Sequence, residues 1–327
     1  MSSGAPGTGG GRVLVTGADG LVGRRVCEKL AAGGRPLRAS VRSVKSGVAP
    51  PAKDVVATGP VGPDTDWSRA LEGVDGVIHL AARVHVLRDP APDPLAEHRK
   101  VNTEGTLNLA RQAASAGVRR VVFASTVKVN GETTPGGPFT EDDPPSPRDP
   151  YAMSKWEAEQ ALGRLSAGGP EIVVLRPPLV YGPGVRGNFR RLLRAVDRGV
   201  PLPLGRATAL RSLLYLDNLV HALVTCLDHP LAAARTYLVS DGEDVSSAEL
   251  VRRLGRALNR TPRLVSVPVG LVRALAGLAG RSADVQRLLS PLQVDARRIR
   301  EELGWAPPFT LDQGIAETAR WYRSAGK

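Results

Sequence analysis

From Arg12 onward the chain alternates short apolar runs with longer amphipathic stretches. This alternation is typical of βαβ units around a parallel sheet, and runs that are apolar at every position suit strands buried on both faces. The predicted strands are Val13–Thr16, Leu37–Val41, Val55–Ala57, Val77–Ala81, Val121–Ala124 and Ile172–Leu175. The predicted helices between them, where apolar residues recur at helical spacing, are Leu21–Ala32, Asp66–Leu71, Pro94–Ala116 and Pro150–Ser166. We therefore expect an α/β fold with a doubly wound parallel sheet.

After Leu175 this rhythm breaks at a stretch rich in proline and glycine, Arg176–Gly184. Helical patterns follow near Phe189–Arg198, Asp217–Leu227, Ser246–Leu258, Gly270–Leu278, Ala296–Leu303 and Leu311–Arg323. We expect a Rossmann domain over residues 12–176, to which the chain returns near 212–235. A smaller, mostly helical substrate domain should take up most of residues 177–327. Residues 1–11 lack a hydrophobic signal core and are expected to form a flexible tail.

A glycine-rich loop, Thr16–Gly23, directly follows the first predicted strand and opens the first helix. A phosphate needs backbone N–H groups and a positive helix end close to it, and residues without a Cβ allow the chain to turn tightly enough. A surface turn is the plain alternative, but the position between strand and helix favours a dinucleotide site. The residues expected to bind the dinucleotide there are Gly17, Gly20, Leu21, Val22 and Gly23.

The end of the second predicted strand bears on the choice of cofactor. An NAD site commonly has an acidic residue there, whereas an arginine accommodates the extra phosphate of NADP. This chain has no carboxylate in Leu37–Arg42, and Arg42, with Ser40, suits a 2′-phosphate. A solvated arginine would look the same, so both NADP and NAD stay open, with NADP favoured.

Tyr151 and Lys155 lie four residues apart at the start of a predicted helix, and residues at that spacing share one helical face. A cation beside a phenol favours the phenolate, which brings the tyrosine pKa toward a useful acid/base range. Lys155 can also bond a ribose hydroxyl of the cofactor. The fifth predicted strand ends at Ser125 and Thr126, whose hydroxyls should face the ligand crevice, where Thr126 can relay a proton to Tyr151.

Together these motifs resemble the extended short-chain dehydrogenase/reductase family, of the NAD-dependent epimerase/dehydratase type. Further matches are His79–Ala82, Val101–Thr106, Arg176–Gly184 and Arg211–Asn218, so the resemblance runs from about Arg12 to Trp321. The stretches Ser125–Glu132 and His79–His85 are most similar to a bacterial subgroup of UDP-glucose 4-epimerase-like proteins. That subgroup includes 4-reductases of UDP-4-keto-6-deoxy-N-acetylhexosamines.

The resemblance implies roles for individual residues. The implied catalytic residues are Thr126, Tyr151 and Lys155. Those implied to bind the cofactor, in addition to Tyr151, Lys155 and the residues above, are Ala81, Ala82, Asn102 and Pro178. The substrate would contact Thr126, and Asn188 and Arg211 would hold its diphosphate. A homodimer formed through the helices Pro94–Ala116 and Pro150–Ser166 is also implied.

Sugar 4,6-dehydratases of this type follow the catalytic threonine with Asp-Glu, whereas Thr126 is followed by Val127 and Lys128. This departure argues against a dehydratase. We therefore expect an NAD(P)-dependent enzyme acting at C4 of a nucleotide-activated sugar such as a UDP-hexose, either as a 4-epimerase or as a 4-keto reductase. The alternative is a non-catalytic NADP-sensing or RNA-binding protein on the same fold, against which the intact triad counts.

The chain has 44 Lys and Arg against 32 Asp and Glu, a net charge of +12. Such a charge suits nucleic acid, an anionic membrane surface or a phosphate-bearing molecule. Basic residues are not interleaved with aromatics and no apolar run could span a bilayer, so we expect a nucleotide-sugar ligand, no nucleic acid, no membrane partner and a cytoplasmic location. Cys27 and Cys226 form no metal or redox motif, and His79, His85 and His98 lack carboxylates at ligand spacing, so no metal is expected.

Overall fold

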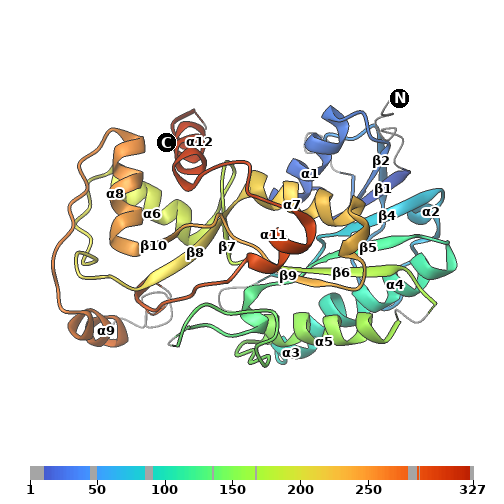
Figure 1. The fold of residues 1–327 in the computed structure, drawn as a ribbon, viewed down its shortest axis with the longest axis horizontal. Helices are drawn as coiled ribbons and strands as arrows, with labels where there is room; N and C mark the ends of the chain where they lie inside the picture. The colour runs from blue at the N-terminus through green and yellow to red at the C-terminus, as the bar shows by residue number, and fades with distance from the viewer. Residues whose placement is uncertain are drawn as a thin grey trace. The chain divides into compact units, whose positions relative to one another are not determined.

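The computed structural model describes residues 11–44, 50–84, 91–134, 136–165, 168–278, 286 and 288–324. The tail expected over residues 1–11 lies almost entirely outside these ranges, as does His85. The chain forms two compact units, coloured by residue number in Figure 1. The first consists of Met1–Ser125, Asp149–Leu175 and Leu223–Thr236, and the second of Thr126–Arg148, Arg176–Ala222 and Tyr237–Lys327.

A seven-stranded sheet has the order β3-β2-β1-β4-β5-β6-β9, and its strands from β3 to β6 form the centre of the first unit. Its strands are β1 (Arg12–Thr16), β2 (Leu37–Val41), β3 (Asp54–Ala57), β4 (Val74–His79), β5 (Arg120–Ala124), β6 (Glu171–Arg176) and β9 (Thr236–Leu238). All pairings from β3 to β6 are parallel, and Val15 of β1 lies between Ala39 of β2 and Ile78 of β4. The predicted doubly wound parallel fold is confirmed.

Helices cover both faces of this sheet, α1 one face and α3 to α5 the other (Figure 1). Their bounds are α1 (Leu21–Ala32), α2 (Ser68–Leu71), α3 (Pro94–His98), α4 (Gly105–Ser115) and α5 (Pro150–Leu165). Leu109 of α4 and Leu162 of α5 pack in one apolar cluster with Val77 and Val121 of the sheet. The long helix expected at Pro94–Ala116 contains a π-helical segment, η1 (Arg99–Glu104), between α3 and α4. Such segments occur frequently at functional sites, and this one includes Asn102.

The second unit contains a three-stranded sheet, β10-β8-β7, that the hydrophobic pattern did not predict. Its strands are β7 (Leu179–Tyr181), β8 (Leu210–Tyr215) and β10 (Asp244–Ser246). The helices of this unit are α6 (Gly187–Asp197), α8 (Ser247–Leu258), α9 (Val269–Leu278), α11 (Arg297–Leu303) and α12 (Leu311–Ser324), with the short η2 (Val127–Val129) near its start. Of these, α6, α8, α9 and α12 share an apolar core with the sheet, to which Tyr181 and Tyr215 also belong.

Helix α7 (Leu216–Asp228) begins in the second unit and ends in the first, where η3 (Pro230–Ala232) follows it. Its last carbonyls are held by Arg120 of β5, which is only 2% exposed. The Arg120 guanidinium donates to the carbonyls of Cys226, Leu227 and His229 and pairs with Glu171. A cation at this position neutralises the negative end of the helix dipole. None of the helices in the described ranges is both long and apolar enough to cross a membrane.

Candidate functional site

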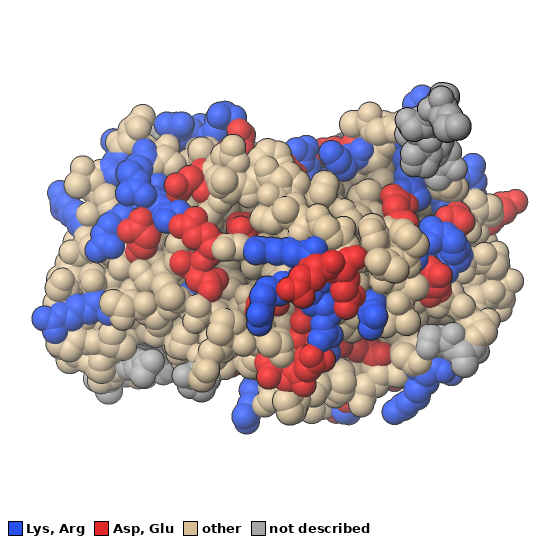
Figure 2. Space-filling view, in the orientation of Figure 1, with Lys and Arg blue, Asp and Glu red and all other residues tan. Residues whose placement is uncertain are grey.

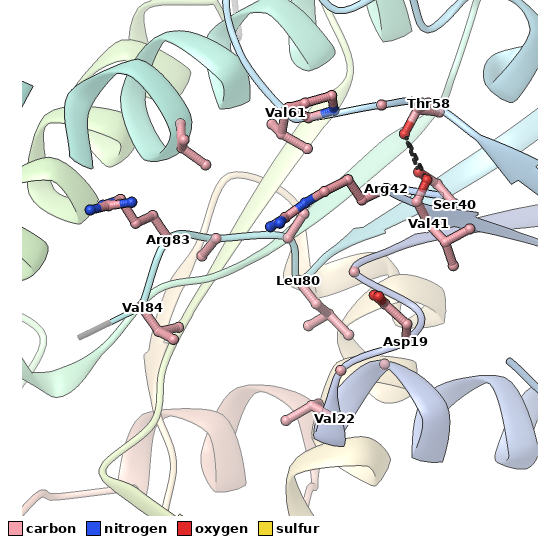
Figure 3. Close-up of a pocket in the computed structure, with 18 of the residues that line it drawn as sticks. Asp19, Val22, Ser40, Val41, Arg42, Thr58, Val61, Leu80, Arg83 and Val84 are labelled. Carbon is pink, nitrogen blue, oxygen red and sulfur yellow. Dashed lines mark hydrogen bonds between the residues drawn. The ribbon is translucent and has the colours of Figure 1, made fainter. Parts of the chain in front are cut away.

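A cavity of about 510 Å³ opens in the first unit at the carboxyl ends of β1, β2, β3 and β4 (Figure 3). This is the edge at which open parallel sheets bind their ligands, beside the reversal of strand order between β1 and β4. Its wall is formed by Gly17, Asp19, Gly20, Leu21, Val22, Gly23, Ser40, Val41, Arg42, Thr58, Gly59, Pro60, Val61, Leu80, Ala81, Ala82, Arg83, Val84 and Val101. The predicted glycine loop, Arg42, Ala81 and Ala82 are thus brought together.

The glycines of the loop occupy positions that no other residue would fit. Gly17 has a φ of +63°, and a Cβ there would lie 2.9 Å from the backbone nitrogen of Ala81. A Cβ on Gly23 would lie 2.1 Å from the carbonyl oxygen of Gly17. Gly20 caps α1 without a side chain, and the first turn of α1 contains no acidic residue. The first-turn amides of α1 therefore have no capping side chain of their own, which leaves them available to a phosphate, although Asp19 of the loop also lines the cavity.

At the other end of the cavity, the hydroxyls of Ser40 and Thr58 and the Arg42 side chain lie at the ends of β2 and β3 (Figure 3). Ser40 and Thr58 are hydrogen-bonded to each other at 2.9 Å. The Arg42 side chain extends across the cavity between Val61 and Leu80, and the wall also includes Arg83. The hydroxyls and the guanidinium of Arg42 could hold a ribose or its 2′-phosphate.

Asn102 connects the cavity wall to α5. Its Oδ1 accepts from the backbone nitrogen of Arg83 at 2.8 Å, and its Nδ2 donates to the Arg83 carbonyl and to Ser154 Oγ, both at 3.0 Å. With a side chain that is 0% exposed and bonded to both Arg83 and Ser154, Asn102 ties the cavity wall to α5. His98 adds a second link, since its Nδ1 bonds the Arg83 carbonyl and its ring meets the Tyr151 ring edge-on, 6.1 Å away.

The His79 side chain is hydrogen-bonded to Thr16, the first residue of the glycine loop. It is 1% exposed, with Nδ1 2.7 Å from Thr16 Oγ1 and Nε2 3.0 Å from Thr106 Oγ1. Thr16 Oγ1 already accepts the backbone N–H groups of Leu80 and Ala81, so it donates to Nδ1 and Nε2 carries the proton. Burial lowers the pKa of His79 to about 3, which keeps the ring neutral. The expectation of a packed, hydrogen-bonded histidine is confirmed, and no cluster of metal ligands occurs in the described residues.

Tyr151 and Lys155 lie in the first two turns of α5, as the spacing predicted. Lys155 is 2% exposed, and its Nζ lies 3.8 Å from the centre of the Phe123 ring. Burial lowers the pKa of Lys155 to about 7, against the opposing charge of Glu159. Burial and the charge of Asp149 raise the pKa of Tyr151 to about 12. The phenol is therefore in its protonated form, contrary to the lowered pKa expected from the sequence, because desolvation prevails at this position.

Sequence reasoning missed one residue of this cluster, Glu159. Its carboxylate is 8% exposed and accepts a short hydrogen bond from Ser125 Oγ. The Ser125 hydroxyl thus points to α5 instead of the ligand crevice where it was expected. Glu159 lies one helical turn beyond Lys155, so the spacing of four residues was a signal that both side chains share a face.

Thr126 begins the second unit and lies two residues after the last residue of β5. It is 9% exposed and caps η2, since its Oγ1 accepts from the backbone nitrogen of Lys128 at 3.3 Å. As an acceptor in that bond, the hydroxyl keeps its own proton to donate. The next residue, Val127, bonds the Pro177 carbonyl through its backbone nitrogen, which fixes η2 beside the predicted cofactor residue Pro178.

Asn188 and Arg211, the predicted diphosphate residues, both belong to the second unit. Asn188 is exposed at the start of α6, and its Oδ1 lies 3.4 Å from Arg191 Nη1. Arg211 lies in β8, where Nη1 donates to the Ser290 carbonyl at 2.6 Å. In the described residues, the cavity wall of the first unit does not include Asn102, Tyr151 or Lys155 either, so the cavity is only part of the predicted site.

Comparison with known proteins identifies a family and several proteins that are similar in sequence or structure. Residues 13–240 match the NAD dependent epimerase/dehydratase family. The chain is 42% identical over 316 residues, 96% of each chain, to a protein of Vibrio cholerae named UDP-glucose 4-epimerase. It is similar in structure to MoeE5 in complex with UDP-glucuronic acid and NAD, with a TM-score of 0.78, 27% identity and coverage of 97% and 100%. It is also similar to the UDP-glucose 4-epimerase of Thermus thermophilus in complex with NAD, with a TM-score of 0.75, 25% identity and coverage of 96% and 100%.

The extent of the family match and the identity to the Vibrio protein over nearly the full length of both chains agree with the parallel sheet, the glycine loop and the pair of Tyr151 and Lys155 described above. The resemblance read from the sequence motifs is thereby confirmed. The chain belongs to the NAD dependent epimerase/dehydratase family.

Proposed function

We propose that this chain is an enzyme acting at C4 of a nucleotide-activated sugar, with UDP-hexoses as the substrate class. The single observation behind the proposal is the continuous hydrogen-bonded path from the cavity wall at Arg83 through Asn102 to Ser154, the neighbour of Lys155. It connects the wall of the cavity that also contains the glycine loop to the part of α5 that carries Tyr151 and Lys155, within one unit. The Vibrio relative named UDP-glucose 4-epimerase and the UDP-sugar complex of MoeE5 support the choice of substrate.

The glycine loop fits a dinucleotide, because Gly17 allows the tight turn against Ala81 and Gly23 allows α1 to pack closely on the loop. Gly20, between them, is the position that a pyrophosphate would approach. A bound nicotinamide supplies the hydride acceptor and donor. Ala81, Ala82 and the first turn of α1 would hold its pyrophosphate side, and Arg42 with Ser40 the ribose. Both solved neighbours named above contain NAD, whereas Arg42 favours NADP. We propose that either dinucleotide binds and that Arg42 sets the ratio of affinities.

Tyr151 is the group that would move the proton of the C4 hydroxyl. With a pKa of about 12 it is protonated and ready to act as an acid, so a role as base requires a nearby cation. Lys155 shares its helical face and would supply that cation in its ammonium form. Thr126, which keeps a donor proton, would bond the reacting oxygen and relay the proton to Tyr151.

The surroundings of Thr126 favour epimerase or reductase chemistry over dehydration. Val127 is 3% exposed and packs with Leu238, Leu292 and Val294, so that position serves the apolar core. Lys128 lies 3.6 Å from Glu132 and presents a cation where a 4,6-dehydratase has a carboxylate. We propose that the chain is not a dehydratase. The relatives favour a 4-epimerase, and Arg42, by favouring NADPH, makes a 4-keto reductase the second candidate.

The test is to incubate the purified protein with UDP-glucose, UDP-N-acetylglucosamine and a UDP-4-keto-6-deoxy sugar while NADPH absorbance and product stereochemistry are followed. Interconversion of epimers without net NADPH consumption would establish the epimerase, and stoichiometric consumption with the keto sugar alone would establish the reductase. Dinucleotide binding without turnover of any sugar would instead favour the non-catalytic alternative.

Replacing Tyr151 by phenylalanine removes only the phenolic oxygen. Tyr151→Phe should abolish turnover and leave dinucleotide affinity within twofold of wild type, because the ring and its packing against His98 remain. Tyr322→Phe, in the core of the second unit, is the matched control and should keep full activity. Undiminished turnover in Tyr151→Phe would refute the mechanism.

A further inference from the structure

The net positive charge of the chain is concentrated on one part of the second unit. Residues 187–200 and 247–272, which include α6 and α8, contain nine arginines, no lysine, one aspartate and one glutamate, a net charge of +7 out of the +12 of the whole chain. The two helices pack together through an apolar core to which Phe189, Leu193 and Leu254 belong. More than half of the excess charge is therefore held by one pair of packed helices and the loops that follow them.

Most of these arginines are exposed. The exposed ones are Arg191, Arg194, Arg198, Arg252, Arg256, Arg260 and Arg263. Figure 2 shows Lys and Arg side chains gathered over α8 and along the adjacent edge of the second unit, whereas basic and acidic side chains alternate over α11. In the part of the chain that the structure describes, two carboxylates pair with these exposed arginines: Glu249 with Arg252 and Arg256 while it also pairs with Arg253, and Asp197 with Arg260.

The same stretches of sequence also expose three apolar side chains. Val200, Val265 and Leu271 are 44%, 45% and 52% exposed. The loop after α6 pairs with the loop after α8, since the backbone nitrogen of Leu202 donates to the Arg263 carbonyl at 2.8 Å and that of Gly205 to the Val265 carbonyl at 3.0 Å. Leu271 follows in the first turn of α9. Val200 and Val265 thus belong to the two paired loops, the second of which also contains Arg263, and Leu271 lies further along the chain in α9.

We propose that this basic face, defined by the seven exposed arginines with Val200, Val265 and Leu271, docks on a membrane surface that contains anionic lipids. Interfacial segments combine arginines, which are attracted to anionic headgroups, with apolar side chains that enter the boundary of the acyl region. The attachment is peripheral, because no helix in the described part of the chain could span the bilayer. The proposal departs from the absence of a membrane partner expected from the sequence.

The composition of the basic face favours lipid over nucleic acid. Proteins that bind single strands stack bases on exposed aromatic rings. The only aromatic residue in residues 187–200 and 247–272 is Phe189, which is 3% exposed and packs on Tyr181. Aliphatic side chains offer no stacking surface for bases, but they do gain from contact with acyl chains.

The experiment is flotation of the full chain with vesicles of phosphatidylcholine, alone or mixed with phosphatidylglycerol. Binding is expected only with the anionic lipid and should weaken as salt is raised. The double variant Arg198→Gln, Arg263→Gln should lower the partition coefficient about 30-fold, because each arginine near an anionic surface contributes about fivefold. Leu271→Glu should weaken binding as well.

The matched control is the double variant Arg69→Gln, Arg111→Gln, which removes the same charge from exposed positions in the first unit and should bind like wild type. Circular dichroism and dinucleotide affinity, measured for all variants, separate a docking defect from misfolding. Equal loss in both double variants, equal binding to neutral vesicles, no binding to either vesicle, or binding of a single-stranded oligonucleotide in place of vesicles would each overturn the proposal.

Discussion

Replacing Glu159 by glutamine tests how the buried lysine is kept charged. Glutamine removes the negative charge and keeps an oxygen that accepts the hydrogen bond from Ser125 Oγ. Burial lowers the pKa of Lys155 to about 7, and the charge of Glu159 opposes that shift. At the roughly 6 Å typical of helix positions four apart, with an effective dielectric constant of about 20, this charge is worth about 3 kcal/mol. Its loss should lower the Lys155 pKa by up to about two pH units.

The assay is the pH dependence of kcat/KM for sugar turnover. The proposed mechanism needs the ammonium form of Lys155, so the alkaline limb of the profile should move to lower pH in Glu159→Gln. Glu157→Gln is the control, because Glu157 lies on the same helix but pairs with Arg99 on a more exposed face. An unchanged profile in Glu159→Gln, or an equal displacement in both variants, would refute the reasoning.

Three further predictions concern residues of the first unit. Gly23→Ala would place a Cβ 2.1 Å from the Gly17 carbonyl oxygen, so it should destabilise the fold by about 1–3 kcal/mol in thermal unfolding and weaken dinucleotide binding in calorimetry. Arg42→Ala should raise the Kd for NADP about tenfold or more and leave that for NAD nearly unchanged, and an equal effect on both would contradict its proposed role. Because the folded state keeps His79 neutral down to a pKa of about 3, while the unfolded chain takes up a proton near pH 6.5, the free energy of unfolding should fall by about 1.4 kcal/mol per pH unit as pH is lowered through that range. Urea titrations of wild type and His79→Gln at several pH values measure how the free energy of unfolding depends on pH. The change per pH unit should be smaller in the variant by the amount that corresponds to one proton.

The first unit could be predicted closely because its signals are local. Each buried parallel strand reads as an apolar run, and the predicted helix Leu21–Ala32 coincides with α1. The glycine loop was recognisable since the collisions at Gly17 and Gly23 leave no other residue type at those positions. The small sheet of the second unit was not predictable in this way. β7 and β10 are three residues long, too short to display a period, and they pair with β8 across long separations in sequence.

The sequence could predict which residues belong to the candidate site, but it could not predict the burial and the partners of their side chains. The spacing of Tyr151 and Lys155 was visible, whereas the burial that raises one pKa and lowers the other depends on tertiary packing. Likewise, the sequence offered Ser125 and Glu159 as separate polar residues, and only the fold pairs them. Asn102 was expected to brace the nicotinamide side of the site, but the partners of its three bonds, Arg83 and Ser154, depend on the fold.

The buried guanidinium of Arg120 has a consequence for how the protein is made. Arg120 donates to the carbonyls of Cys226, Leu227 and His229, which lie more than one hundred residues later in the sequence. During synthesis these carbonyls therefore emerge from the ribosome well after Arg120 does. Until then a nascent chain that has already built β1 to β5 must keep Arg120 in water, so the sheet cannot close over it. A gene fragment ending at Arg176 would therefore lack the part that completes the first unit, and the nucleotide-binding half should not be obtainable as an independent module.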